Sequence, residues 1–231
     1  MKRFYKEAAV VEADGKFGVT LDGRKIRTPA KALLNFPNRV LADAIAVEWN
    51  AQGDEVDVDS MSMMKFASTA IDRVQPRRNA VIDQISAYAN TDLLCYRAEQ
   101  PDDLVAMQEG AWQPLLDWCD DAYGARLKTT MGVIPIDQED DALSAVKEAV
   151  ATHDDFALAA LHELTAVSGS VVIALAVTAG HLCVADAADA SQIDETFQAE
   201  RWGYDKEAAD YLAGRRWSLE AAADYHALLG I

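Results

Sequence analysis

The chain has 231 residues, about half of them apolar, and a formal net charge of −17. A chain of this length can bury a sizeable core, and its charge repels nucleic acids and anionic membranes, so neither is expected as a partner. Its three cysteines, Cys95, Cys119 and Cys183, are odd in number and scattered, which favours buried small hydrophobic residues over disulfides or a zinc site.

The charge is unevenly distributed along the chain. Residues 1–80 hold 13 Lys and Arg against 11 Asp and Glu, whereas residues 81–231 hold 8 against 27. The acidic part would speed encounter with a basic partner, although the same charge also serves solubility.

The N-terminal part alternates between apolar and polar residues, as β-strands do. Asp-Gly pairs at 14–15 and 22–23 separate the alternating runs, and this dipeptide favours a type I′ hairpin turn because both central residues need positive φ. We therefore expect a three-stranded antiparallel meander, with residues 31–36 as a candidate fourth strand.

From Pro37 onward the apolar spacing changes to that of helices. The first is expected at 37–52, where Pro occupies the first turn. Short extended pieces are expected at 92–98 and 126–132. Further helices are predicted at 61–74, 76–92, 102–123, 140–153, 154–169, 170–180, 189–203 and 205–230. The apolar run at 170–180 is too short to span a bilayer and is expected to be a buried helix.

The predicted fold class is α+β. A small N-terminal antiparallel β module, residues 1–60 including the helix at 37–52, packs on a larger, mainly α-helical C-terminal domain, residues 61–231.

Catalytic signatures are missing from the sequence. It has no phosphate-binding glycine loop, no nucleophile elbow and no zinc-protease motif, and its four histidines are far apart. The acidic segment 53–60 lacks the glycine and the distal glutamate of a calcium loop, so a solvated connector is expected. We predict no enzyme, no cofactor, no metal and no small-molecule substrate.

The segment IDETFQAERWGYD, residues 193–205, combines glutamates with a tryptophan on one predicted helix. The helical period places Glu200 on the apolar stripe of Ile193 and Phe197, and Glu195 with Trp202 on the other side. An acidic group on an apolar stripe is either paired with a cation or used functionally. The two glutamates point about 140° apart, so they are badly placed to act as a catalytic pair.

Eight motifs occur in an order that resembles one known family, the assembly chaperone of the F(1) sector of ATP synthase that receives the alpha subunit. The resemblance covers residue 3 to about residue 213. The motifs are RFYK, LDGRKIRTP, LADAIAVEWNAQ, STAID, NTDLLCYRA, QEGAWQPLLDW, GSVVIALAV and DETFQAERWGYD.

The resemblance implies an α+β fold and a non-enzymatic function. Such a chaperone transiently binds the unassembled alpha subunit, prevents its aggregation, masks the surface later taken by beta and hands it over for hexamer assembly, without nucleotide or metal. Eukaryotic members act in the mitochondrial matrix and carry a presequence. This chain begins almost directly at RFYK, so we expect a bacterial member acting in the cytoplasm.

Six candidate partner-binding residues follow from two of the motifs. The resemblance leaves open which glutamate of the second motif matters and whether the tryptophan of the first is core or interface. The candidates are Glu48, Trp49 and Gln52 from the first motif and Glu195, Glu200 and Trp202 from the second.

Two other functions stay open at this stage. One is an acidic helical adaptor without a dedicated client, whose binding would fade with salt. The other is an unrecognised hydrolase that uses Glu200 as a buried general acid, which requires a pocket and a second titratable group.

Overall fold

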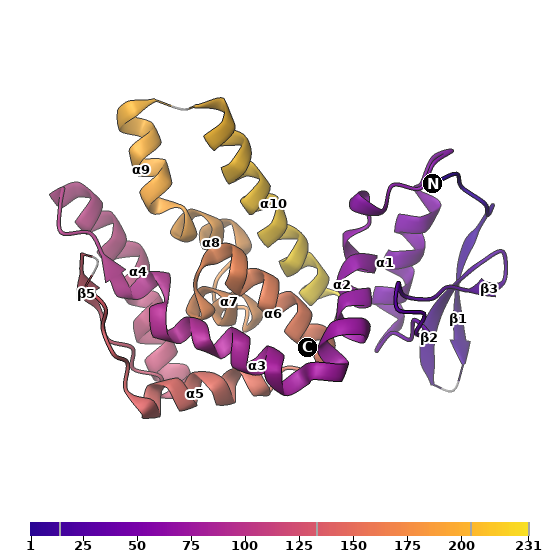
Figure 1. Cartoon of the computed structure of the whole chain (residues 1–231), viewed down its shortest axis with the longest axis horizontal. Helices are drawn as coiled ribbons and strands as arrows, with labels where there is room; N and C mark the ends of the chain where they lie inside the picture. The colour runs from indigo at the N-terminus through magenta and orange to yellow at the C-terminus, as the bar shows by residue number, and fades with distance from the viewer. Residues whose placement is uncertain (14, 133, 204, 231) are drawn as a thin grey trace. The chain divides into compact units, whose positions relative to one another are not determined.

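The computed structural model describes residues 1–13, 15–132, 134–203 and 205–230 (Figure 1). The chain forms two compact units. Unit 1 comprises Met1–Arg78, Asp154–Ala160 and Asp224–Ile231, and unit 2 comprises Asn79–His153 and Leu161–Ala223. These units follow contacts rather than chain order, and the domain boundary expected near residue 60 stays a prediction.

Unit 1 contains the predicted antiparallel meander. Its strands are β1 (Ala8–Ala13), β2 (Lys16–Leu21) and the two-residue β3 (Arg24–Lys25), in the order β1-β2-β3. Asp22 and Gly23 both have positive φ, 48° and 79°, as a type I′ turn requires. The second predicted turn pair includes Asp14, which lies outside the described residues.

The fourth strand expected at 31–36 does not form. This segment forms two isolated bridges, Phe17–Phe36 with strand β2 and Arg27–Leu33 outside the strands, but no continuous ladder among the described residues. Lys31 has a φ of 68°, a left-handed conformation that a strand cannot contain. Phe36 is nevertheless buried at 1% exposure, so the segment contributes a core side chain rather than a strand.

Helix α1 (Arg39–Asn50) packs on β1 and β2 through the fully buried Leu41 and Ile45. Its N-cap Asn38 accepts a hydrogen bond from the Leu41 N–H. Helix α2 (Ser62–Thr69) continues into a π-helical turn, Ala70–Val74. The helices predicted at 37–52 and 61–74 are therefore confirmed, the second with this change of winding.

Unit 2 is built almost wholly from helices. A short parallel pair, β4 (Tyr96–Arg97) with β5 (Thr130–Met131), confirms part of each predicted extended piece, whereas Leu93–Cys95 in the first piece forms a 3-10 helix. Helix α8 was not predicted separately; it ends before Gln192, which breaks the expected helix 189–203. The helices are α3 (Arg78–Ser86), α4 (Asp102–Tyr123), α5 (Asp140–Ala151), α6 (Asp155–Ser168), α7 (Val171–Thr178), α8 (Val184–Ser191), α9 (Ile193–Trp202) and α10 (Lys206–Ala227). Three of them, α3, α6 and α10, also contribute residues to unit 1.

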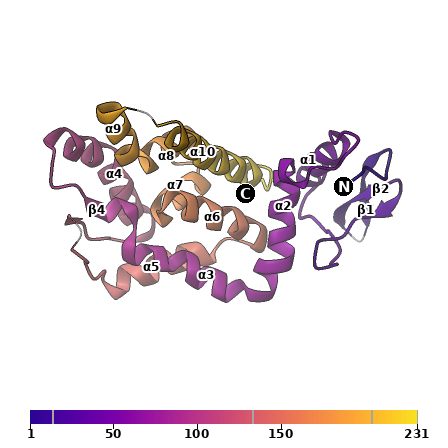
Figure 2. The same cartoon turned by 45° about the horizontal axis from the view of Figure 1, so that its top comes forward.

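Helix α7 is the core of unit 2, as predicted for the apolar run 170–180. Residues 171–176 are all fully buried, and α4 and α8 pack against the helix (Figure 2). Its N-terminus is held by two side chains. Ser170 Oγ accepts from Ile173 N at 3.0 Å, and the fully buried Asp92 carboxylate accepts from Val172 N at 3.3 Å.

The predicted fold class, α+β, is confirmed. The cysteine prediction is partly wrong, because Cys95 and Cys119 are buried but Cys183 is exposed. Cys183 occupies the N-cap of α8, where its sulfur accepts from Asp186 N, a position that helices leave at the surface. No helix in the described part of the chain is long and apolar enough to cross a membrane.

Candidate functional site

The six predicted partner-binding residues fall into two groups in different units. Glu48, Trp49 and Gln52 belong to unit 1. The other three belong to unit 2, on helix α9. The structure therefore does not gather them within one unit.

Glu48 and Gln52 hold the junction between α1 and α2. Helix α2 has no side-chain N-cap, and the Glu48 carboxylate accepts from the N–H groups of Met63 and Met64 at 2.7 and 2.9 Å instead. Burial raises the pKa of Glu48, and these hydrogen bonds oppose that rise. Gln52 accepts from Asp57 N at 2.7 Å and donates to Glu48 O. The polar atoms of both residues are thus engaged within the chain.

Trp49 is half-buried in unit 1. Tyr5 meets its ring edge-on with centroids 5.5 Å apart, and the Tyr5 hydroxyl donates to the Trp49 carbonyl at 2.6 Å. The indole Nε1 is buried and has no acceptor within the described residues. A buried donor without an acceptor lowers the stability of the fold by about 1–3 kcal/mol. The position of this ring is therefore not explained by a hydrogen bond of its indole N–H.

Glu195 lies at the packed base of α9 and is paired. Its carboxylate accepts from Arg215 of α10 at 2.7 Å. The same guanidinium also donates to the carbonyl oxygens of Val167 and Ser191, so one side chain ties α10 to the ends of α6 and α8. The Arg215 side chain is 17% exposed and that of Glu195 43%. This geometry is that of a structural ion pair.

Glu200 and Trp202 lie at the other end of α9. Both are exposed, Trp202 at 78%. Neither side chain forms a hydrogen bond or ion pair with another described residue. Of the two alternatives for Glu200, pairing with a cation is not seen among the described residues, because the buried residues of α9 end at Phe197; a functional use stays a prediction. Arg201 stacks on the Phe197 ring and pairs with Asp103, closing the core there.

A shallow apolar groove runs along the base of α9. It has a volume of about 450 Å³ and lies between α4, α8 and α9, with Met107, Leu182 and Ile193 among its lining residues. Met107 is 42% exposed. We call this groove together with Glu200 and Trp202 the α9 surface.

Several exposed apolar residues were missed by the sequence analysis. Besides Met107, Tyr211 and Trp217 of α10 are 65% and 53% exposed. The available signal was an aromatic pair in a segment, DKEAADYLAGRRW, that is otherwise mostly polar or alanine and offers no continuous apolar stripe.

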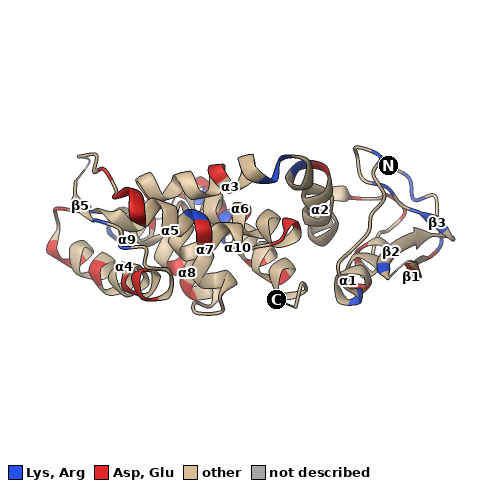
Figure 3. Cartoon of the chain, turned by 90° about the horizontal axis from the view of Figure 1, so that it is seen from below, with Lys and Arg blue, Asp and Glu red and all other residues tan. Residues whose placement is uncertain are grey.

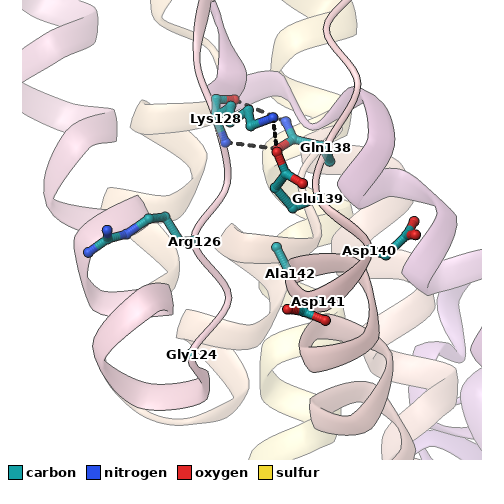
Figure 4. Close-up of a pocket in the computed structure, with 8 residues that line it drawn as sticks. All are labelled: Gly124, Arg126, Lys128, Gln138, Glu139, Asp140, Asp141 and Ala142. Atoms are coloured by element: carbon teal, nitrogen blue, oxygen red, sulfur yellow. Dashed lines mark hydrogen bonds and ion pairs between the residues drawn. The ribbon is translucent and has the colours of Figure 1, made fainter.

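A second, polar pocket of about 520 Å³ lies where the chain enters α5 (Figure 4). Gln138 exchanges two hydrogen bonds with the backbone of Lys128, and the Lys128 ammonium pairs with Glu139, which lowers the pKa of that carboxyl. The charges of Lys128 and Glu139 therefore compensate each other. Across the described ranges, no three His, Cys, Asp or Glu side chains are grouped to hold a metal ion.

The charges separate strongly between the units. Unit 2 carries 8 Lys and Arg against 24 Asp and Glu, a net −16, whereas unit 1 carries 13 against 14, a net −1. Figure 3 shows the acidic residues along the helices of unit 2. The α9 surface thus combines an apolar groove at the base of α9 with an exposed tryptophan at the other end of the helix, and both belong to a strongly acidic unit.

Comparisons with known proteins identify the family. A crystal structure of Atp12 from Paracoccus denitrificans is 39% identical, with a TM-score of 0.95 over 99% of this chain and 98% of that one. A proposed chaperone from Agrobacterium tumefaciens is also 39% identical, with a TM-score of 0.94 over 99% and 86% of the two chains. The mitochondrial protein atp12 of Schizosaccharomyces pombe is 24% identical over 87% of this chain and 74% of its own length. The model of the family described as ATP12 chaperone protein matches residues 2–120, so the chain belongs to the ATP12 chaperone family.

Proposed function

We propose that this protein is an assembly chaperone that transiently binds the unassembled alpha subunit of the ATP synthase catalytic sector and hands it over for assembly with beta. The observation that carries the proposal is the α9 surface of a member of this family. There Trp202 is 78% exposed, and the unpaired Glu200 is exposed two residues before it on the same helix. Exposed tryptophans are enriched among residues that dominate binding energy at interfaces.

The composition of the α9 surface suits a reversible cover. Met107 and Leu182 supply an adaptable apolar contact, and Trp202 supplies an aromatic anchor. Glu200 adds a carboxylate that can accept a charge-assisted hydrogen bond from a basic client residue. Affinity in the micromolar region, near −8 kcal/mol, would hold the client while still permitting release.

The net −16 of unit 2 supports association with a basic client surface. Such a field mainly raises the association rate, and salt screens it over roughly 8–10 Å. We therefore expect the association rate to fall with ionic strength, while the apolar contacts of the α9 surface keep the complex selective.

The hydrolase alternative has no support in the site geometry. It needs Glu200 in a pocket facing a second titratable group. Glu200 is exposed, and it lines none of the described pockets.

The experiment is to dilute-refold purified ATP synthase alpha subunit with and without this protein and to follow light scattering. The matched client is the beta subunit, treated identically. We expect selective suppression of alpha aggregation. Equal protection of both clients, or of neither, would contradict the proposal and favour the alternative, an acidic adaptor without a dedicated client.

Two variants connect that assay to the α9 surface. Trp202→Ala and Glu200→Gln should each weaken protection at least fivefold, measured as the chaperone concentration that gives half suppression. Trp217→Ala is the control, because it removes another exposed tryptophan from α10 without touching α9. If the control loses as much activity as Trp202→Ala, exposed aromatic area in general is responsible and the α9 surface is not the client site.

A further inference from the structure

Unit 1 contains a larger apolar groove that the α9 surface does not explain. Its volume is about 810 Å³, and all of its lining residues lie between Arg27 and Arg73. This volume falls within the roughly 300–1,000 Å³ typical of ligand pockets. The groove is therefore large enough to bind a ligand or a segment of a partner.

Apolar side chains make up much of the groove. Met61 and Met64 of the α2 region are buried at 0% and 8% exposure, and the half-buried Trp49 lies with them. Val58 stands at the edge and is 55% exposed. Methionine-rich surfaces adapt to the side chains of different partners because the thioether chain is flexible and polarisable.

The groove is rimmed by cations. Arg27, Lys65 and Arg73 all line it and are exposed. Lys65 has a loose contact, 3.6 Å, with the almost fully exposed carboxylate of Asp59, which contributes little in water. Its charge also acts on the Glu48 carboxylate, whose pKa it lowers against the effect of burial. The Arg73 guanidinium makes no ion pair or hydrogen bond within the described ranges.

The one acidic side chain among the lining residues is already engaged. Asp72 accepts from the Thr28 hydroxyl at 2.6 Å and from Ala30 N at 3.0 Å, and so fixes the loop at one side of the groove. Asp72 and Arg73 belong to the π-helical turn Ala70–Val74. Such turns occur frequently at functional sites.

We propose that this groove binds an acidic amphipathic segment of a protein partner. Its apolar side chains would contact Trp49, Val58 and Met64, and its carboxylates would pair with Arg27, Lys65 and Arg73. Charge complementarity selects this occupant, since three exposed cations face one engaged carboxylate. The buried Nε1 of Trp49 would gain an acceptor from such a segment if the neighbouring methionine side chains yield to it. The groove goes beyond the proposed function, because it selects the opposite charge to the α9 surface.

The test uses the full chain and two fluorescein-labelled 18-residue peptides. Both carry leucine at i, i+3, i+4 and i+7 spacing, and they differ only in having glutamate or glutamine at the remaining positions. Fluorescence anisotropy at about 0.1 M salt should give saturable binding of the glutamate peptide, and binding at least fivefold weaker for the glutamine peptide. Absence of saturable binding, or equal affinity for both peptides, would overturn the proposal.

Variants locate the binding. Arg73→Glu and Val58→Asp should each raise the Kd for the glutamate peptide at least tenfold. Their controls make the same substitutions on exposed residues outside the groove lining, Arg77→Glu and Val47→Asp, and should change the Kd less than twofold. Should Val58→Asp lose its fold by circular dichroism, Arg73→Glu decides alone. Equal losses in variants and controls would refute the groove.

One further arm distinguishes a membrane surface from a protein segment. Sedimentation with phosphatidylglycerol vesicles should show no binding that depends on Arg73. Vesicle binding lost in Arg73→Glu, without peptide binding, would assign the cations to lipid headgroups and overturn the proposal. None of these measurements uses the alpha subunit, so failure here leaves the proposed function to its own test.

Discussion

Acidic side chains are buried and hydrogen-bonded at the centre of unit 2 but exposed and unpaired at the free end of α9. Around α7, Asp92 is fully buried and accepts hydrogen bonds from Leu94 N at 3.1 Å and Val172 N at 3.3 Å. At the free end of α9, both Glu200 and Trp202 are exposed to solvent. Glu195 lies between these extremes, half-exposed and paired with Arg215.

This difference separates structure from recognition within one helix. A carboxylate whose acceptors are all used inside the chain stabilises the fold, and its loss is measured as unfolding free energy. A carboxylate without a partner costs the fold nothing to remove, so its effect appears only when another molecule binds. The two glutamates that the sequence left equivalent are therefore expected to behave differently.

The largest effect is expected for Arg215→Ala. The substitution leaves Glu195 unpaired and removes donors from the carbonyls of Val167 and Ser191. A buried pair broken on one side costs about 3–5 kcal/mol. Because Glu195 is 43% exposed, we expect about 2–3 kcal/mol in urea unfolding. Arg216→Ala is the control, since Arg216 pairs with Asp189 on more exposed side chains and should cost less. Equal losses would show that α9 has no firmly packed base.

The pH dependence of stability should reveal Asp92. Burial raises the pKa of its carboxyl from 3.8 to about 6, despite the hydrogen bonds that oppose the rise. A group whose pKa rises on folding stabilises the fold at low pH and loses that contribution as the pH rises through the folded value. Relative to Asp92→Asn, the wild-type protein should therefore lose about 1 kcal/mol of unfolding free energy between pH 5 and pH 7. A constant or opposite difference in urea unfolding would contradict this assignment.

A smaller loss is expected for Glu195→Gln. The amide keeps a hydrogen-bond acceptor for Arg215 but removes the charge, and the pair is partly solvated. We expect about 0.5–1 kcal/mol, which corresponds to a fall of about 1–4 °C in the thermal midpoint. If the thermal midpoint is unchanged and protection of the client is lost, Glu195 contacts the client rather than stabilising the fold.

The smallest effect on stability is expected at the free end of α9. Glu200→Gln and Trp202→Ala should each change the unfolding free energy by less than about 0.5 kcal/mol, because both side chains are exposed and make no polar contact with the described residues. Thermal melts measured beside the client assay would check this. A fall of several degrees in either variant would mean that this end of α9 is packed in solution.

Much of the fold could be read from local sequence patterns. The hairpin turn at Asp22-Gly23, helix α4 at 102–123 and the buried helix α7 each follow from spacing and turn chemistry that act within a few residues. The strand expected at 31–36 was wrong, because the segment forms only isolated bridges at Leu33 and Phe36 among the described residues, and Lys31 at its start is left-handed. Alternating apolarity does not report that conformation.

The candidate site could be predicted only in part. The sequence named Glu195, Glu200 and Trp202 but placed Glu200 on the packed stripe, because the helical period continues beyond the point where neighbouring elements stop. Gln52 and Glu48 turned out to hold the junction of α1 and α2 through contacts such as Met63 N to Glu48. The Met63–Glu48 contact joins residues 15 apart across a helix junction, and helical or strand periodicity does not encode it.

The sequence by itself determined the fold class, the order of most elements, the acidic field and the family resemblance, because these depend on composition, periodicity and motif order. Only the tertiary structure decided which carboxylate is paired and which is free, and where the two grooves lie. Those properties depend on distances between separate elements: Arg215 reaches Glu195 from another helix, whereas no described side chain pairs with Glu200. Packing, rather than residue type, distinguishes the two glutamates of α9.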